Sequence, residues 1–266
     1  MKIEFLNKAL WFKIPSSEPG SEGKKAGSSK GENNLEKILV IGDVHIGYEE
    51  ALEKQGGFTS RSQFEETMKD IRKIFEEIKA SSSKDEGNLV KEIIILGDLK
   101  HEFGEISSQE WRETLKFLDF LKENAGKIIL VRGNHDKILE PIAKVKNLEI
   151  YDFYKKQGIC FIHGNRVITD CFDKDVKMIV AGHRHPAVVL EKGAKRETYK
   201  CFLVGKFKGK KLILIPSFLP LIEGTDVIRE DDYETALNLN FKNFEVFIVG
   251  DRVYDFGKLR DLKKMN

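Results

Sequence analysis

Four short apolar runs of this chain each end at a glycine and a polar residue, and this repeat constrains the fold more than any other feature. The runs are residues 37–41, 93–96, 128–131 and 178–181. Their length and their content of Ile, Val and Leu are typical of buried β-strands. In α/β sheets the carboxyl ends of the strands form the edge where ligands bind. We therefore expect a functional site where these four runs end.

The stretches between and after the runs predict helices and hairpins. Apolar residues recur with a helical period from Phe64 to Ile78 and again from Trp111 to Leu121. Ser60 and Gln63 are spaced as a capping box for the first of these helices. Hairpins are expected with turns at 7–8, 208–209 and 250–252. This order, strands and helices first and more β-rich later, favours one α/β domain over residues 1–266.

One segment, Ser16 to Asn34, contains no large apolar residue. It cannot bury enough surface to offset the entropy of ordering it, so we expect a flexible insertion between two strands. A shorter break of similar composition is expected at 81–88. The remaining composition, 41% apolar and 33% charged with a net charge of +2, is that of a soluble globular protein without a strong bias toward nucleic acid.

The three cysteines, Cys160, Cys171 and Cys201, form no CxxC pair and are odd in number. They suggest neither a disulfide framework nor a zinc knuckle, so we expect reduced, buried thiols. Residues 1–14 lack the continuous apolar core of a signal peptide. No apolar stretch is long enough to span a bilayer, so no membrane partner is expected and the predicted location is cytoplasmic.

All six histidines fall at or near these strand ends. The contexts are Asp43-Val44-His45, Asp98-Leu99-Lys100-His101, Asn134-His135, His163-Gly164 and His183-Arg184-His185. Imidazole and carboxylate together suit divalent Mn, Fe, Zn, Co or Ni. With two such ions, the carboxylates of Asp43 and Asp98 leave an excess of positive charge that attracts phosphate oxygens and lowers the pKa of a bridging water. This chemistry favours hydrolysis of a phosphate ester. Redox chemistry is disfavoured, because no Cys or Tyr ligand is evident in the sequence.

Taken in order, these motifs resemble the calcineurin-like metallophosphoesterase superfamily, whose pattern is DxH, GD, GNH(D/E), H and GHxH. The resemblance spans Asp43 to His185, and every element of the pattern is present. It implies a four-layer α/β/β/α sandwich of two mixed sheets with helices outside. It also implies two metal ions, of which Mn is expected. The implied ligands of metal 1 are Asp43, His45, Asp98 and His185, and those of metal 2 are Asp98, Asn134, His163 and His183.

The resemblance further implies catalysis by a metal-bridging hydroxide, with His135 as the general acid that protonates the leaving oxygen. One departure is informative. Protein phosphatases of this superfamily carry GDxxDRG, whose second Asp orients the catalytic histidine, whereas this chain has His101 at that position. The string from Gly97 to Gly104 is similar to ICC-like phosphoesterases, as are residues 43–49 and 216–221. Some bacterial members of that branch are associated with a DNA ligase.

We therefore expect hydrolysis of phosphodiesters of nucleotide or nucleic-acid type, with His135 and His101 as the catalytic residues. One alternative is a DNA repair nuclease, although no separate DNA-binding cap is evident after His185. The other alternative is a non-catalytic scaffold with a phosphoesterase fold. Such scaffolds lose ligands or the catalytic histidine, and here all of them are present.

The motifs fix the roles of other polar residues around them less closely. For His101, contact with the substrate phosphate, orientation of His135 and capping of a loop all remain open. We expect Asp136 to cap a helical turn beginning at Lys137. Arg132 and Arg184 are left open as phosphate contacts. Lys100 is grouped with residues 206–211 as part of a solvated lysine-rich face.

Overall fold

Two mixed β-sheets form the framework of the molecule. The computed structural model describes residues 1–16, 35–81, 90–102, 104–229 and 239–263. The first sheet has the strand order β1-β2-β3-β4-β5-β6 and is parallel from β3 onward. Its strands are β1 (Lys2–Leu6), β2 (Ala9–Pro15), β3 (Leu35–Ile41), β4 (Val90–Leu96), β5 (Ala125–Val131) and β6 (Glu149–Tyr151).

The second sheet has the order β13-β10-β11-β12-β9-β8-β7, and β14 and β15 extend it from β11. Within it β8, β9 and β12 run parallel, and β10–β11 and β11–β12 are antiparallel hairpins. Its first strands are β7 (Tyr154–Lys156), β8 (Ile159–Ile162), β9 (Met178–Ala181), β10 (Pro186–Lys192) and β11 (Lys195–Phe207). The others are β12 (Lys210–Leu214), β13 (Thr225–Asp226), β14 (Glu245–Val249) and β15 (Val253–Lys258).

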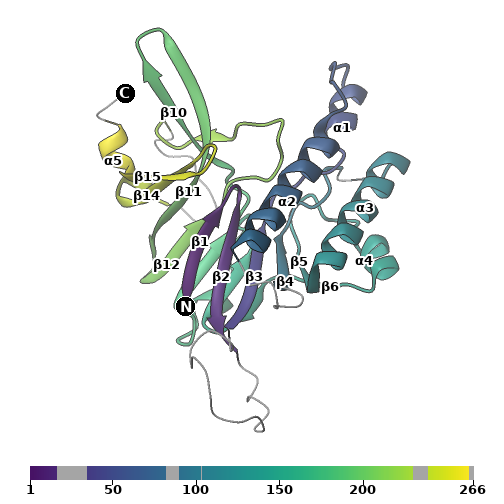
Figure 1. Cartoon of the computed structure of the whole chain (residues 1–266), viewed down its shortest axis with the longest axis horizontal. Coiled ribbons are helices and arrows are strands. Elements are labelled where there is room, and N and C mark those ends of the chain that lie inside the picture. Colours follow the sequence, from purple (N-terminus) through teal and green to yellow (C-terminus); the bar gives the residue numbers. More distant parts are fainter. Residues whose placement is uncertain (17–34, 82–89, 103, 230–238, 264–266) are drawn as a thin grey trace.

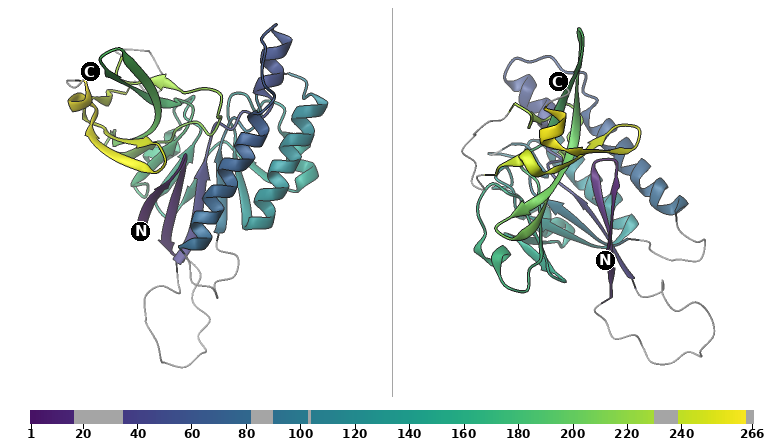
Figure 2. Two further views of the ribbon diagram at one scale, coloured as in Figure 1. Left: turned by 45° about the horizontal axis from the view of Figure 1, so that its top comes forward. Right: turned by 90° about the vertical axis from the view of Figure 1, so that its left-hand side faces the viewer.

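The helices form the outer layers of the sandwich. They are α1 (Tyr48–Lys54), α2 (Gln63–Ala80), α3 (Ser108–Asn124), α4 (Glu140–Lys146) and the single turn α5 (Leu259–Leu262), with 3-10 turns η1 (Thr169–Phe172) and η2 (Phe241–Asn243). Figures 1 and 2 show the longer helices on one side of the first sheet and the second sheet on the other. The expected four-layer architecture is confirmed, with short turns supplying the fourth layer.

Three apolar clusters hold these layers together. Between the sheets, Phe12 of β2 meets Phe161 of β8 edge to face, with ring centroids 6.0 Å apart. The apolar faces of α2 and α3, including Ile71 and Phe117, pack on the outer face of the first sheet. A third cluster lies under η2 and α5 on the far side of the second sheet. Burial of apolar surface on both faces of each sheet is the main stabilising term.

The structure confirms the predicted strands, both predicted helices and all three hairpin turns. The predicted capping box of α2 is wrong. The helix begins at Gln63 after Ser62, whose side chain makes no capping hydrogen bond, and the Glu49 carboxylate accepts from the backbone amides of Ser62 and Gln63 instead. The Gln63 side chain has other partners. Its Nε2 donates to the His45 carbonyl at 2.7 Å, and its Oε1 accepts from the Glu49 backbone amide at 3.1 Å.

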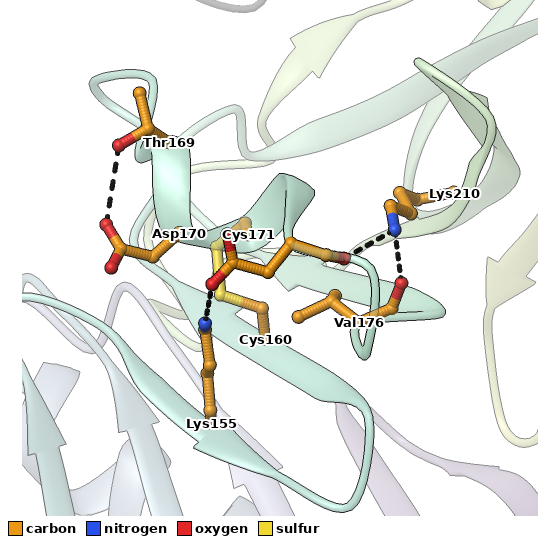
Figure 3. The surroundings of a disulfide bond; sticks show 8 residues. Lys155, Cys160, Thr169, Asp170, Cys171, Val176 and Lys210 are labelled. Carbon is orange, nitrogen blue, oxygen red and sulfur yellow. Dashed lines mark hydrogen bonds and ion pairs between the residues drawn. A yellow bond between two sulfur atoms is a disulfide. The ribbon is translucent and has the colours of Figure 1, made fainter.

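A disulfide between Cys160 and Cys171 corrects the prediction of reduced thiols (Figure 3). Cys160 lies on β8 and Cys171 on η1, and both are fully buried. Their spacing of 11 residues gives no motif, because only the packing of η1 against β8 brings them together. The cysteine content therefore no longer supports a reducing compartment. Cys201 remains a buried free thiol as expected, and burial raises its pKa.

Two expectations concern segments at the edge of what is described. The predicted insertion at 16–34 lies outside the described residues from residue 17 onward, and so does the break at 81–88 from residue 82. Among the helices that the structure describes, none combines the length and the apolar character needed to cross a bilayer.

Candidate metal centre

The predicted ligands converge where the two sheets meet at the carboxyl ends of their parallel strands. Asp43, Asp98 and Asn134 follow β3, β4 and β5 of the first sheet, and His163 and His183 follow β8 and β9 of the second. Hydrogen bonds join the two edges. The His183 amide donates to Asp43 Oδ2 at 2.9 Å, and His163 Nδ1 lies 2.9 Å from the Leu96 carbonyl.

Most of these ligands have an unusual backbone conformation. Asp43, His45, Asp98, His183 and His185 all have φ between 45° and 65°, in the left-handed region. A residue with a Cβ atom pays roughly 1–3 kcal/mol to adopt such a conformation, and it does so mainly at functional sites. Five of the ten described non-glycine residues with positive φ therefore lie at the site that the motifs predict, and the other five lie in turns and bends.

The first group of side chains comprises Asp43, His45 and His185. One ligand atom from each lies within 4.8 Å of the others. His185 Nε2 is 3.3 Å from Asp43 Oδ1, and His45 Nε2 is 3.7 Å from Asp98 Oδ2. Asp43 is fully buried and His45 is 4% exposed, so water cannot satisfy their polar atoms.

A second group, Asp98, His163 and His183, adjoins the first. His163 Nε2 lies 3.2 Å from Asp98 Oδ2, 2.9 Å from Asn134 Oδ1 and 3.0 Å from His183 Nδ1. Asp98 Oδ2 therefore faces both groups, because His45 of the first group approaches the same oxygen. All seven predicted ligands are thus brought together.

The electrostatics of the centre favour positive charge between the two carboxylates. Burial alone would raise the pKa values of Asp43 and Asp98, but neighbouring histidines, mainly His185 and His163 respectively, lower both. Burial opposes protonation of His163, yet the hydrogen bond to Asp98 and the charges of Asp43 and Asp98 raise its pKa to about 9. Burial lowers the pKa of His45 to about 2, which leaves the neutral imidazole that a metal ligand requires.

The residues present fit divalent cations. Asp43 Oδ1 and His45 Nε2 are buried atoms without a hydrogen-bond partner among the described residues, and both belong to the first group. A buried polar atom left unpaired is costly unless an ion satisfies it. His163 Nδ1 faces a carbonyl, which can only accept, so the proton sits there and leaves Nε2 for a ligand bond.

The two histidines expected to be catalytic lie beside these groups. The His135 amide donates to Asp98 Oδ1 at 2.8 Å, and His135 Nδ1 lies 2.5 Å from the His101 carbonyl. The His101 ring contacts the metal-site histidine itself, with its Nδ1 3.2 Å from His45 Nδ1. Burial, and then the charge of His135, lowers the pKa of His101 to about 4, so His101 is neutral at neutral pH.

The structure corrects the assignment of Asp136 and shows where two nearby arginines lie. Asp136 does not cap a turn at Lys137. Its carboxylate accepts from the amides of Gly133 at 3.0 Å and Leu99 at 3.1 Å and so ties the loops after β4 and β5 together. Arg132 bonds Glu140, and the Arg184 guanidinium lies over the Phe241 ring at 5.7 Å. Both arginines are thus directed toward groups other than the ligands.

Lys100 contradicts the sequence analysis most directly. It was expected on a solvated face, but it is fully buried, and its Nζ donates to the His135 carbonyl at 2.9 Å. Glu110 of α3 is likewise fully buried next to the same loop, and the sequence analysis missed it. The Ser-x-x-Glu spacing of Ser107 and Glu110 is a sequence signal, but it points only to a helix start.

The 216–221 segment, part of the sequence resemblance, lies beside the first group. The amides of Phe218 and Leu219 donate to the carbonyls of Gly42 and Asp43. The half-buried Lys200 side chain donates from its ammonium to Ser217 Oγ at 2.7 Å and to the Ser217 and Leu219 carbonyls. The segment therefore fixes the backbone of the β3 end, where Asp43 is strained.

Comparison with known proteins agrees with this geometry. The family model described as calcineurin-like phosphoesterase matches residues 36–187, more than half of the chain and all seven predicted ligands. A search of curated proteins finds no match.

Among solved structures, one shows a similar fold and others match more weakly. The nuclease MPE of Pseudomonas putida has a TM-score of 0.56 at 19% identity, covering 82% of this chain and 87% of that chain. Vacuolar Protein Sorting 29 of Cryptosporidium parvum has a TM-score of 0.33 at 17% identity and covers 83% and 97%. A protein of unknown function from Aquifex aeolicus, AQ665, has a TM-score of 0.33 at 21% identity, covering 56% and 78%. At this level of identity the likeness to MPE extends to the fold alone.

Proposed function

From the premise that this chain belongs to the calcineurin-like phosphoesterase family and is a metal-dependent phosphoesterase, we propose that it hydrolyses phosphodiesters of nucleotide or nucleic-acid type. One observation carries the proposal. Asp98 Oδ2 faces both ligand groups, while Asp98 Oδ1 holds the backbone of His135. A single carboxylate thus links two cation positions to the residue that would donate a proton.

We assign Asp43, His45, Asp98 and His185 to one cation and Asp98, Asn134, His163 and His183 to the other. Mixed nitrogen and oxygen donors suit Mn²⁺, with Fe, Zn, Co or Ni as alternatives. When bound, two such ions polarise the phosphoryl oxygens and lower the pKa of a water between them. Ligands come from both sheets, which supports a single catalytic domain over residues 1–266.

His135 is the general acid in this proposal. Its Nδ1 faces the His101 carbonyl at 2.5 Å, and a carbonyl only accepts, so Nδ1 carries a proton. That hydrogen bond fixes the ring, and a second proton taken up at Nε2 to form the imidazolium would be the one given to the leaving oxygen. The carbonyl of residue 101 thereby takes the orienting role that protein phosphatases give to an Asp at the matching position.

The role of His101 follows from the tautomer of the neighbouring His45. If His45 binds a cation through Nε2, its proton is on Nδ1 and is donated to His101 Nδ1, 3.2 Å away. His101, which is neutral because burial and His135 lower its pKa to about 4, then carries its own proton on Nε2. We propose that this N–H donates to a phosphoryl oxygen of the substrate.

The charges around the centre favour a diester over a monoester. A terminal phosphate carries close to two negative charges, and proteins usually match it with Arg or Lys. Among the described residues, Arg132 and Lys100 bond acidic or carbonyl partners and Arg184 contacts Phe241, as given above. A diester carries one negative charge. The fold also accommodates such a substrate elsewhere, since the Pseudomonas putida protein is a nuclease.

The test is hydrolysis of bis(p-nitrophenyl) phosphate and p-nitrophenyl phosphate by metal-stripped protein resupplied with Mn²⁺. We expect Mn²⁺-dependent turnover with preference for the diester. Asp98→Asn should slow it ~1000-fold or more, because several kcal/mol of transition-state stabilisation depend on the cations.

Asp251→Asn, at the exposed turn between β14 and β15, is the matched control and should retain full activity. Two bound metals without turnover of either ester would instead favour the scaffold alternative. Preference for the monoester would reject the charge argument.

A further inference from the structure

We propose that Lys100 and Glu110 are positioning residues that hold the acid His135 and the neighbouring His101 in register, through backbone groups of residues 101, 102 and 135. This inference rests on the proposed function, because it assigns these two buried charges to the proton-donating step. Neither residue has a ligand atom in the His/Asp groups described above. Their partners are backbone groups of the loops that follow β4 and β5.

Lys100 joins the loops that follow β4 and β5. Its side chain is fully buried, and its Nζ donates to the carbonyls of His135, at 2.9 Å, and Glu102. A buried ammonium is tolerated only when hydrogen bonds replace the lost water. Here the replacement partners are the loop that carries His101 and the residue that carries the acid, so the ammonium fixes one relative to the other.

Glu110 of α3 also binds the loop that follows β4. Ser107 accepts from the Glu110 amide at 3.0 Å and caps α3, which is half of a capping box. In a complete capping box the Glu side chain would return to the amide of the cap residue. Here the Glu110 carboxylate instead accepts from the amides of His101 at 2.9 Å and Glu102 at 3.0 Å. The carboxylate thus serves the loop rather than its own helix.

The peptide group between residues 101 and 102 links Glu110 to His135. Its N–H donates to Glu110, and its carbonyl lies 2.5 Å from His135 Nδ1. Because a trans peptide is planar, its N–H and C=O point to opposite sides and move together. A carboxylate on one side therefore fixes the hydrogen-bond acceptor on the other. In this chain a carboxylate orients the acid through one intervening peptide instead of by direct contact.

The test compares two diesters that differ in their need for an acid, bis(p-nitrophenyl) phosphate and diphenyl phosphate. Phenolate is the poorer leaving group, so general-acid catalysis, worth roughly 10²–10⁴-fold in all, matters more for diphenyl phosphate. His135→Ala should therefore slow diphenyl phosphate at least ~10-fold more than the nitrophenyl ester. Lys100→Met and Glu110→Ala should show the same selective loss, ~10–100-fold on diphenyl phosphate.

Three further variants separate positioning from general damage. Glu110→Gln keeps an oxygen that can accept from both amides, so it should recover most of the activity that Glu110→Ala loses. In the His135→Ala background, Lys100→Met should slow both esters equally, because no acid is left to position and only the contact of His101 is disturbed. Lys156→Met removes another mostly buried ammonium, paired with Glu36 and Glu92 at the opposite end of the strands, and any loss should be equal on both esters.

The outcomes are distinct. Equal loss on both esters in the single variants, or a further selective loss on diphenyl phosphate in the His135→Ala background, would overturn the positioning role while leaving the proposed function intact. Absence of leaving-group discrimination in His135→Ala would instead reject the acid role, and the positioning of an acid with it. If Lys100→Met does not fold, as judged by circular dichroism, the comparison of Glu110→Ala with Glu110→Gln decides.

Discussion

Gly182→Ala offers a sharp probe of the centre, because one added carbon would strike one ligand. A Cβ at residue 182 would lie 2.6 Å from Asp43 Oδ2, and the next nearest atom, the Leu96 carbonyl oxygen, would be 3.3 Å away. Gly182 is not in the left-handed region, so alanine can adopt its backbone and the effect is steric. Since ordinary contacts of a Cβ atom start at 3.4 Å, the Asp43 carboxylate must retreat by about 0.8 Å.

The expected cost is larger for activity than for stability. Overpacking of this kind destabilises a fold by about 1–3 kcal/mol. A misplacement of about 1 Å at a reacting centre costs ~100-fold in rate. Asp43 Oδ2 also accepts from the His183 amide, so the shift disturbs both ligand groups. We therefore expect turnover of bis(p-nitrophenyl) phosphate to fall ~100-fold, with weaker Mn²⁺ binding and a folded protein.

The assay is steady-state turnover across a Mn²⁺ titration, with thermal unfolding measured on the same samples. Gly250→Ala is the matched control, because its nearest new contact is an ordinary 3.4 Å from Tyr254 and it lies at the turn between β14 and β15. Wild-type turnover and Mn²⁺ affinity in Gly182→Ala would refute the reasoning that Asp43 is a ligand held by close packing.

Two further predictions test the disulfide and the charge of the centre. Protein denatured in urea without reductant should expose one reactive thiol, Cys201, and after reduction it should expose three. Three reactive thiols without reductant would mean that Cys160 and Cys171 are not bonded. For His163, the hydrogen bond to Asp98 and the charges of Asp43 and Asp98 outweigh burial and raise the pKa from 6.5 to about 9 in the folded metal-free protein. Between these values only the folded state holds the proton, so this stabilising contribution, ~3 kcal/mol, is complete below pH 6.5 and is lost as the pH rises to 9. Urea unfolding of chelator-treated protein should show this decline, and His163→Gln should flatten it; an unchanged slope in His163→Gln would contradict the assignment.

The strand ends show what could be predicted from sequence. Apolar runs that end at Gly42, Gly97 and Gly182 predict strands, and parallel strands place their carboxyl ends at one edge. The convergence of the ligands follows from this arrangement. The sequence could not show that Asp98 Oδ2 faces both groups, because that depends on how the two sheets meet.

The misses have a common physical cause. The charge of Lys100 predicts a solvated lysine from sequence, because the backbone groups that it binds are brought to it only by the fold. Gln63 and Glu110 have the spacing of capping residues, yet their side chains bind the loops of the centre instead of their helices. Cys160 and Cys171 pair only through the packing of η1 on β8. In each case a tertiary contact determines the role, and local pattern carries no trace of it.

The most direct test of the central claim is anomalous diffraction from crystals of the Mn²⁺-loaded protein. The account predicts two manganese peaks about 3.5–4 Å apart with the Asp98 carboxylate between them. The Asp43, His45 and His185 side chains should surround one peak, and Asn134, His163 and His183 the other. A single peak, or two peaks that do not share Asp98, would contradict the account.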